Sequence, residues 1–339
     1  MSHPLVHPKA RVEHDSTHKK KQPSGGSDPI SDIVTQISAI SQALSQIASD
    51  VGQLGSSPSP APAPTPTPTP APTPAPSPGS ISWPTFTGDA VLVGKSQSGM
   101  VSVYLDANLQ SNSEAMQNAS DLQGDADRIV NLNNSIFAIK EKTPVNVLLY
   151  AMGGMTDGTG GADHMDCTFQ NGGNIEVCVS YGNSSRCSAL FMAELSECAM
   201  NGQLCGYSTG EALSRWCTMV CNPGALSDFA SAPTWYADGM ANWVDQTEHS
   251  DQDYDSIGCG MAFISYLIHR EATLPQIAQQ MVKLGDSGTL AKLYNVIGMG
   301  PQNVAWQMFS QAVTALGGVS NDDPFGQTAN AMIYPHPHV

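Results

Sequence analysis

The chain has 339 residues, and its 30 acidic and 14 basic side chains give a formal net charge of −16. This excess of negative charge argues against a nucleic-acid partner, because phosphate groups bind where Lys and Arg gather. No stretch is both long and apolar enough for a bilayer, so we expect no membrane span.

The N-terminal tail, residues 1–27, is polar and contains the run Lys19-Lys20-Lys21. Such a composition cannot build a core, so we expect this tail to be disordered. It also lacks the apolar centre of a signal peptide. We therefore expect either that a leader is missing from this sequence or that the protein leaves the cell by another route, such as inside a virus particle.

The next segment, residues 28–55, carries apolar residues at alternating spacings of three and four. They are Ile30, Ile33, Ile37, Ile40, Leu44, Ile47, Val51 and Leu54. This spacing predicts a coiled coil, and isoleucine at both seam positions favours three strands. We expect a homotrimer through residues 28–55. The alternative is an amphipathic helix that packs on the globular part of the same chain.

A proline-rich stalk is predicted for residues 56–79, because every second residue from Pro58 to Pro78 is proline. Such a segment forms a semi-rigid polyproline II helix that extends about 3.1 Å per residue. Coiled coil and stalk together would hold a globular head, residues 80–339, away from the attachment point of the N-terminus. This arrangement favours an extracellular, cell-surface or virion location, with an extracellular protein or surface ligand as partner.

The head is predicted to have an α+β fold, with a sheet-containing front half and a helical back half. Alternating and apolar runs predict strands at 90–94, 100–106 and 145–152, an edge strand at 174–181, and a helix at 113–138. Helical periodicity then predicts helices at 186–200, 209–221, 233–246, 257–271, 274–284, 288–297 and 301–316.

All eight cysteines lie between Cys167 and Cys259, and an even number in one block suits an oxidising compartment. The stretch CTFQNGGNIEVC is typical of a hairpin that would pair Cys167 with Cys178. We expect at least two disulfides, with Cys217 and Cys221 bonded to partners elsewhere. The alternative is that the cysteines are reduced and buried.

Two motifs carry a resemblance to a known family. The helix FMAELSECAM follows a predicted edge strand, and PTWYADGMANWV comes 33 residues after its end. This order resembles the gluzincin, or peptidase MA-like, zinc metallopeptidases, in which a His-Glu-x-x-His helix is followed by a helix with the third zinc ligand. The residues that match the second motif are Pro233, Trp235, Gly239, Ala241 and Trp243, with Asp238 at the ligand position.

The resemblance implies a role for each matched position of the first motif. Ala193 stands for the first histidine, Glu194 for the catalytic general base, and Glu197 for the second histidine. The metal ligands would then be Glu197 and Asp238, with His164 from a glycine-rich loop as a replacement for the missing one. Catalytic zinc needs three good protein ligands, and here one position is a methyl group, so we expect no bound metal. The alternative is a site for calcium or zinc.

If Asp238 packs beside Glu194 and Glu197, three carboxylates share a small volume and must take up protons, bind a cation or pair with a basic residue. Arg215 is the candidate partner, and Glu211 competes for it. Two functions follow as hypotheses. The first is a catalytically inactive, metallopeptidase-like protein with a binding or structural role. The second is an active metal-dependent hydrolase with Glu194 as its base. A plain solvated helix face at Glu194 and Glu197 is the third interpretation.

Overall fold

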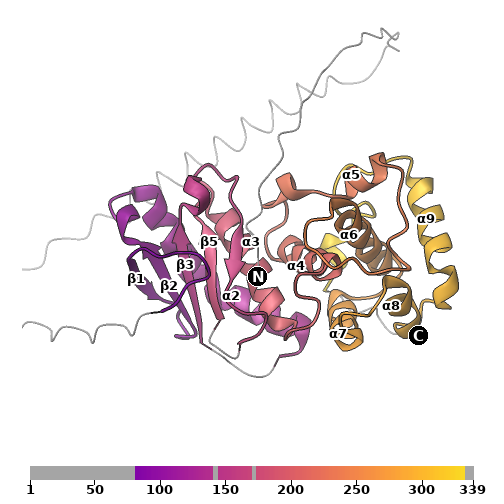
Figure 1. Ribbon diagram of the computed structural model, residues 1–339, viewed down its shortest axis with the longest axis horizontal. Helices are drawn as coiled ribbons and strands as arrows, with labels where there is room; N and C mark the ends of the chain where they lie inside the picture. The colour runs from indigo at the N-terminus through magenta and orange to yellow at the C-terminus, as the bar shows by residue number, and fades with distance from the viewer. Residues whose placement is uncertain (1–80, 140–143, 170–172, 333–339) are drawn as a thin grey trace, which may run out of the picture. The chain divides into compact units, whose positions relative to one another are not determined.

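Five strands form one mixed sheet in the computed structural model (Figure 1). Their order across the sheet is β1-β2-β3-β5-β4. The inner strands β2, β3 and β5 are parallel, whereas β1 and β4 are antiparallel to their neighbours at the two edges. The bounds are β1 Ala90–Lys95, β2 Val101–Asp106, β3 Val145–Tyr150, β4 Ala162–His164 and β5 Gly173–Cys178.

The structure describes residues 81–139, 144–169 and 173–332. The predicted N-terminal tail at 1–27, the trimeric coiled coil at 28–55 and the stalk at 56–79 lie outside the described residues. All the described residues belong to one compact unit.

Two helices, α2 (Ser113–Phe137) and α3 (Ser184–Ala199), cover one face of the sheet. Val101, Val103 and Leu105 alternate along β2 toward this side and are fully buried. Each helix begins at an asparagine whose side chain accepts hydrogen bonds from the first turn, Asn112 for α2 and Asn183 for α3. The packing of α3 against β5 and β4 places this helix beside the sheet edge.

The other face of the sheet is covered by the chain that leads into β1. Trp83 contacts Tyr104 edge to face, at 5.5 Å between ring centroids. Glu176 of β5 is fully buried and accepts hydrogen bonds from the backbone amides of Thr85 and Phe86, at 3.0 and 2.7 Å. This carboxylate therefore anchors the start of the described chain to β5, the strand next to the sheet edge.

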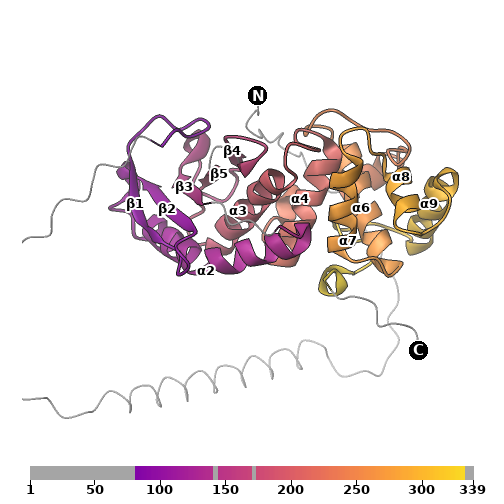
Figure 2. The same ribbon diagram turned by 90° about the horizontal axis from the view of Figure 1, so that it is seen from below.

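The back half of the described chain is helical (Figures 1 and 2). Helices α3 and α4 lie between the sheet and the group around α6, which packs against the remaining helices. The bounds are α4 Ser208–Cys221, α5 Ala232–Ala237, α6 Tyr254–His269, α7 Leu274–Leu284, α8 Leu290–Val296 and α9 Ala305–Leu316. The indole of Trp216 is buried and donates to the carbonyl of Met261, which joins α4 to α6.

The α+β class is confirmed, but two predicted elements are wrong. The predicted edge strand at 174–181 corresponds to β5, which lies between β3 and β4. The true edge is β4, a three-residue strand inside a stretch expected to be a loop. The predicted helix at 233–246 ends at Ala237, because Gly239 and Met240 take positive φ angles of 98° and 56°.

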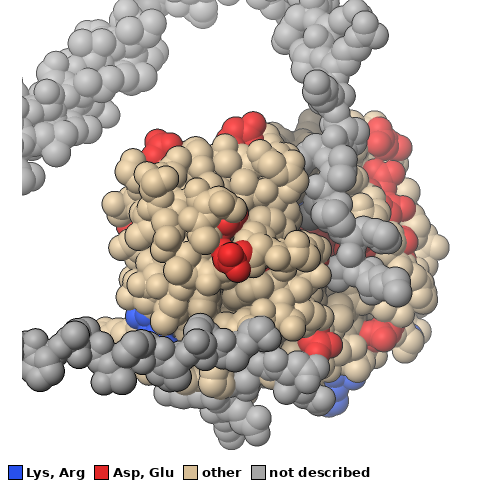
Figure 3. Space-filling model, turned by 60° about the vertical axis from the view of Figure 1, so that its left-hand side comes forward, with Lys and Arg blue, Asp and Glu red and all other residues tan. Residues whose placement is uncertain are grey.

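No helix within the described ranges is long and apolar enough to span a membrane. On the face seen in Figure 3, acidic side chains are more frequent than Lys and Arg, as the composition predicts.

Candidate functional site

His164 is the last residue of the edge strand β4 and is the centre of the candidate site. The strand pairs with β5 so that His164 lies opposite Ile175. The carboxylate of Asp163 accepts a hydrogen bond from the backbone amide of His164 at 2.8 Å. Strand pairing and this bond fix the backbone, and only 5% of the histidine side chain is exposed.

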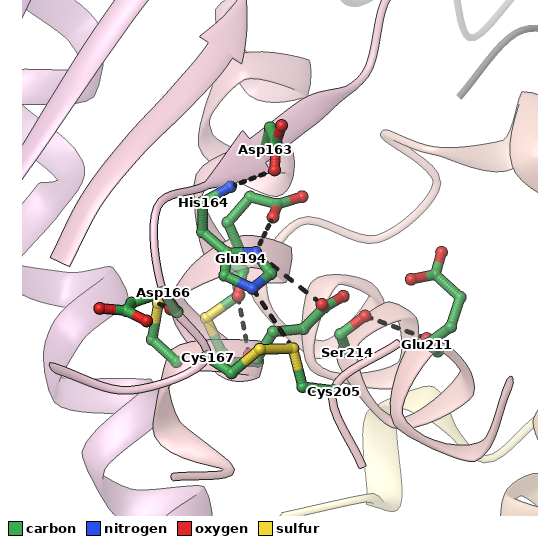
Figure 4. Close-up of polar contacts among 12 residues, drawn as sticks. Asp163, His164, Asp166, Cys167, Glu194, Cys205, Glu211 and Ser214 are labelled. Atoms are coloured by element: carbon green, nitrogen blue, oxygen red, sulfur yellow. Dashed lines mark hydrogen bonds and ion pairs between the residues drawn. A yellow bond between two sulfur atoms is a disulfide. The ribbon is translucent and has the colours of Figure 1, made fainter. Parts of the chain in front are cut away.

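Glu194 and Glu197 come from α3, one helical turn apart, and both lie within 4 Å of the imidazole of His164. Figure 4 shows Glu194 beside the ring. The Nδ1 atom of His164 lies 2.7 Å from Oε2 of Glu194 and 3.9 Å from Oε2 of Glu197. The glutamate side chains are 13% and 14% exposed, so the cluster is largely shielded from water. The interpretation of Glu194 and Glu197 as a solvated helix face does not fit this burial.

A disulfide lies on the other side of the imidazole. It joins Cys167, in the loop after β4, to Cys205, in the loop before α4. The Nε2 atom of His164 is 3.7 Å from the sulfur of Cys205. Figure 4 shows the ring between Glu194 and this disulfide. His164 therefore contacts a carboxylate through one ring nitrogen and the sulfur of Cys205 through the other.

The predicted pairing of Cys167 with Cys178 is wrong. The strand register places Cys178 opposite Gly161, whose carbonyl accepts from the Cys178 amide at 2.9 Å. Cys167 belongs to the turn between β4 and β5, so the two cysteines are not cross-strand partners. The prediction of at least two disulfides also fails, because the described cysteines form only one. The free cysteines are Cys178, Cys187, Cys198, Cys217, Cys221 and Cys259, and all are buried.

A further acid, Glu211 of α4, extends the cluster. Its negative charge acts on Glu197 and raises the pKa of that carboxyl. The Oε1 atom of Glu211 also accepts from Nε of the buried Arg215 at 2.7 Å, one turn along the same helix. Arg215 therefore pairs with Glu211, the residue expected to compete for it, and not with Glu194 or Glu197 directly.

Burial changes the protonation of this cluster. It raises the pKa of Glu194, although the hydrogen bond from His164 works in the opposite direction. Burial raises the pKa of Glu197 well above the usual range, and the negative charges of Glu194 and Glu211 raise it further. Burial alone would lower the pKa of His164, but its bond to Glu194 raises it overall. The cluster therefore binds protons more tightly than the same side chains do in water.

Asp238, the predicted third ligand, is not part of this cluster. It is exposed at the C-terminal end of α5. Within the described chain, no group of three potential ligands with atoms inside 4.8 Å of one another includes Asp238. Beyond it the chain turns back, and the indole of Trp235 donates to the carbonyl of Ala241 at 2.9 Å. The short helix therefore ends before it can bring this acid toward α3.

Two groups of potential metal ligands meet at His164. The first contains His164, Glu194 and Glu197, and the second contains His164, Cys167 and Cys205. In each group the ligand atoms lie within 4.8 Å of one another. Nitrogen with two carboxylates suits hard or borderline divalent cations, whereas nitrogen with two thiolates suits zinc.

Sequence reasoning identified His164, Glu194 and Glu197 and expected Glu211 to pair with Arg215, but it missed Cys205. Comparisons of the chain with protein-family models, with curated proteins and with solved structures found no match. The resemblance to gluzincin metallopeptidases therefore depends on the two sequence motifs alone, and the second motif does not deliver its expected ligand to the site.

Proposed function

We propose that the head, residues 80–339, is a metallopeptidase-like binding or structural module that holds a divalent cation at His164, Glu194 and Glu197. One observation carries the proposal. A strand and a helix bring one imidazole nitrogen and two carboxylate oxygens within 4.8 Å of one another in a largely buried place.

The balance of charge supports a cation. When all groups are ionised, Glu194, Glu197 and Glu211 carry three negative charges against the two positive charges of His164 and Arg215. Buried carboxylates with excess charge must take up protons or a cation. A divalent ion that displaces the proton from Nδ1 of His164 would neutralise Glu194 and Glu197 together, and Arg215 would remain paired with Glu211.

The same geometry argues against peptidase activity. If Glu194 acts as general base, His164 and Glu197 remain as the only protein ligands in this cluster, fewer than the three that a catalytic zinc uses. If Glu194 is itself a ligand, it cannot also act as the base, and the next acid of the cluster, Glu211, is paired with Arg215. A cation that is bound without an adjacent base fits a structural or recognition role.

An active metal-dependent hydrolase is the second candidate. His164 favours it, because this residue supplies an imidazole that the degenerate helix motif lacks. The two candidates share His164 and Glu197 as ligands, and they differ in the role of Glu194 and in turnover. Peptidase activity that needs added metal and disappears in Glu194→Gln would establish the hydrolase.

The binding experiment uses the full chain, stripped with a chelator and then titrated with Mn²⁺, Ca²⁺ or Zn²⁺ by calorimetry under oxidising conditions. We expect one equivalent of at least one of these ions to bind. His164→Asn and Glu197→Gln should each remove this binding, whereas Asp238→Asn should leave it unchanged. No binding of any of the three ions, or equal loss in the Asp238→Asn control, would contradict the proposal.

The setting of the head remains part of the proposal. A homotrimeric coiled coil at 28–55 and a stalk at 56–79 would present the cation-bearing module at an extracellular, cell or virion surface to a protein or surface ligand. The regular spacing of isoleucines and prolines in the sequence supports this arrangement.

A further inference from the structure

The second group of potential ligands at His164 contains the disulfide. Nε2 of His164 lies 3.7 Å from the sulfur of Cys205, and a ring nitrogen of His164 and the sulfurs of Cys167 and Cys205 lie within 4.8 Å of one another. The opposite ring nitrogen is held by Glu194 at 2.7 Å. The imidazole is therefore oriented by a carboxylate on one side and directed at two sulfur atoms on the other (Figure 4).

We propose that reduction of the Cys167–Cys205 disulfide creates a zinc site made of His164, Cys167 and Cys205. A dithiol reductant would transfer two electrons and two protons to the sulfur pair, become a cyclic disulfide itself, and leave two cysteine thiols. Zn²⁺ would then bind both sulfurs as thiolates and release the two protons to water. Redox state thus controls whether this site exists.

The distances suit zinc after little movement. In a tetrahedral site, Zn–S bonds of about 2.3 Å and Zn–N bonds of about 2.0 Å place sulfur and nitrogen about 3.5 Å apart and the two sulfurs about 3.8 Å apart. The observed separation between Nε2 of His164 and the sulfur of Cys205 is 3.7 Å. The Cα atoms of Cys167 and Cys205 are 5.9 Å apart, so rotation of the two cysteine side chains can separate the sulfurs while the backbone stays in place.

Glu194 provides the second feature of such a site. Histidine ligands of metals usually donate their other N–H to a carboxylate, which fixes the tautomer and the ring orientation. The bond between Nδ1 of His164 and Glu194 has this form. Two cysteines and one histidine leave the fourth zinc position open for water. His164 is buried, whereas Cys167 and Cys205 are partly exposed, so a reductant and a metal ion can reach the two sulfurs from solvent.

The two metal sites exclude each other at the imidazole. Binding of a hard cation through Nδ1 requires that nitrogen to lose its proton, and Nε2 then carries it toward Cys205. Binding of zinc through Nε2 requires the proton to stay on Nδ1, where Glu194 accepts it. The oxidised protein would therefore use its nitrogen–carboxylate group and the reduced protein its nitrogen–thiolate group. The thiolate site does not depend on the carboxylate site proposed above, and each can fail alone.

The test uses Co²⁺ as a spectroscopic substitute for zinc in the full chain. A phosphine reduces the disulfide, takes oxygen from water to become a phosphine oxide, and leaves the two water hydrogens on the cysteines. We expect a near-ultraviolet thiolate-to-cobalt band at one equivalent of Co²⁺ in the reduced protein, no band in the oxidised protein, and loss of the band when Zn²⁺ is added.

Variants assign the ligands. Reduced Cys205→Ser should lack the band. The reduced wild type also has no disulfide, so a difference between these two proteins reports the loss of a metal ligand and not the loss of the cross-link. Cys198→Ser, which removes a free buried thiol of α3 outside both groups, should keep the band. Glu194→Gln should keep it with an affinity about 10–100-fold lower. Glu197→Gln should affect only the carboxylate site.

Several results would overturn the inference. They are free thiols at Cys167 and Cys205 after oxidation, a reduced protein without the band, and a band that persists in Cys205→Ser. If reduction unfolds the protein, added Zn²⁺ should refold it, as followed by circular dichroism, and failure to refold would also count against the site.

Discussion

The cation-free protein is expected to lose stability as pH rises from 5 to 8, and Glu197→Gln should reduce this loss. Burial raises the pKa of Glu197 well above its ordinary value of 4.5. The unfolded chain then releases this proton at a lower pH than the folded chain does. Glu197 therefore makes its full contribution to the free energy of unfolding below its ordinary pKa. This contribution is lost as pH rises through the raised pKa.

His164 acts in the same direction. Its bond to Glu194 raises the pKa of the imidazole above 6.5, against the effect of burial. The folded chain therefore holds this proton to a higher pH than the unfolded chain, and the stabilisation is lost as pH rises through the raised value. Asp163 and Glu211 add negative potential around the ring, which favours the imidazolium further.

The size of the effect follows from linkage. Each unit of pKa difference between the folded and unfolded chains changes the free energy of unfolding by about 1.4 kcal/mol. A bound cation should reverse the trend, because it binds the deprotonated carboxylates. At 100 times its Kd it would add about 2.7 kcal/mol, which corresponds to a rise in Tm of roughly 5–11 °C for a domain of 150–250 residues.

Urea unfolding with a chelator at pH 5 and pH 8 measures the loss, and repetition with saturating cation measures the recovery. The neutral isostere in Glu197→Gln should give a flatter pH profile and, without cation, a higher stability than the wild type at pH 8. A wild type that becomes more stable between pH 5 and 8 in chelator, with Glu197→Gln unchanged in slope, would refute the reasoning.

Three further predictions test the frame around the site. Glu176→Ala should lower the free energy of unfolding in urea by about 2–6 kcal/mol, because two backbone amides lose their acceptor. Glu176→Gln should lower it by about 2 kcal/mol. Equal stability of both variants and the wild type would contradict this role of Glu176. Gly160→Ala should destabilise the head by about 1–3 kcal/mol, because the new Cβ would clash with the sulfur of Cys178. The control Gly124→Ala, on α2, should not destabilise the head, because nothing lies within 4 Å of the new Cβ. Light scattering should give the full chain three times the protomer mass and a chain without residues 28–55 the protomer mass, and equal values would exclude the coiled-coil trimer.

Much of the fold was predictable because long periodic runs report burial directly. The alternation along β2 and the helical spacing of α2 are strong signals, and both elements occur where expected. The edge strand β4 was not predictable, since three residues among glycines carry no periodicity. The early end of α5 was missed because the apolar spacing continues past Asp238, although Gly239 marks the stop.

The site was predictable only in part, for a different reason. Glu194 and Glu197 share a helix, so their spacing alone places them side by side. Cys205 lies 38 residues beyond its partner Cys167, and disulfide connectivity cannot be deduced from cysteine spacing. Asp238 was assigned through the second motif, which implies a helix longer than the chain forms. Contacts that depend on tertiary packing are invisible to local pattern.

The imidazole of this site comes from a strand and the carboxylates come from a helix, so the geometry of the site depends on how the two elements pack. In a His-Glu-x-x-His helix, both imidazoles have positions set by one helix, so the zinc geometry survives small movements of the surrounding sheet. Here Ala193 leaves the helix with carboxylates only, and the imidazole comes from β4. The distance between His164 and Glu194 is therefore set by the pairing of β4 with β5 and by the packing of α3 on both strands. The Cys167–Cys205 disulfide ties the loop after β4 to the loop before α4, so it restrains the same distance. The metal affinity of the proposed site should therefore depend on the integrity of the edge strand and its disulfide, and not on that of the helix alone.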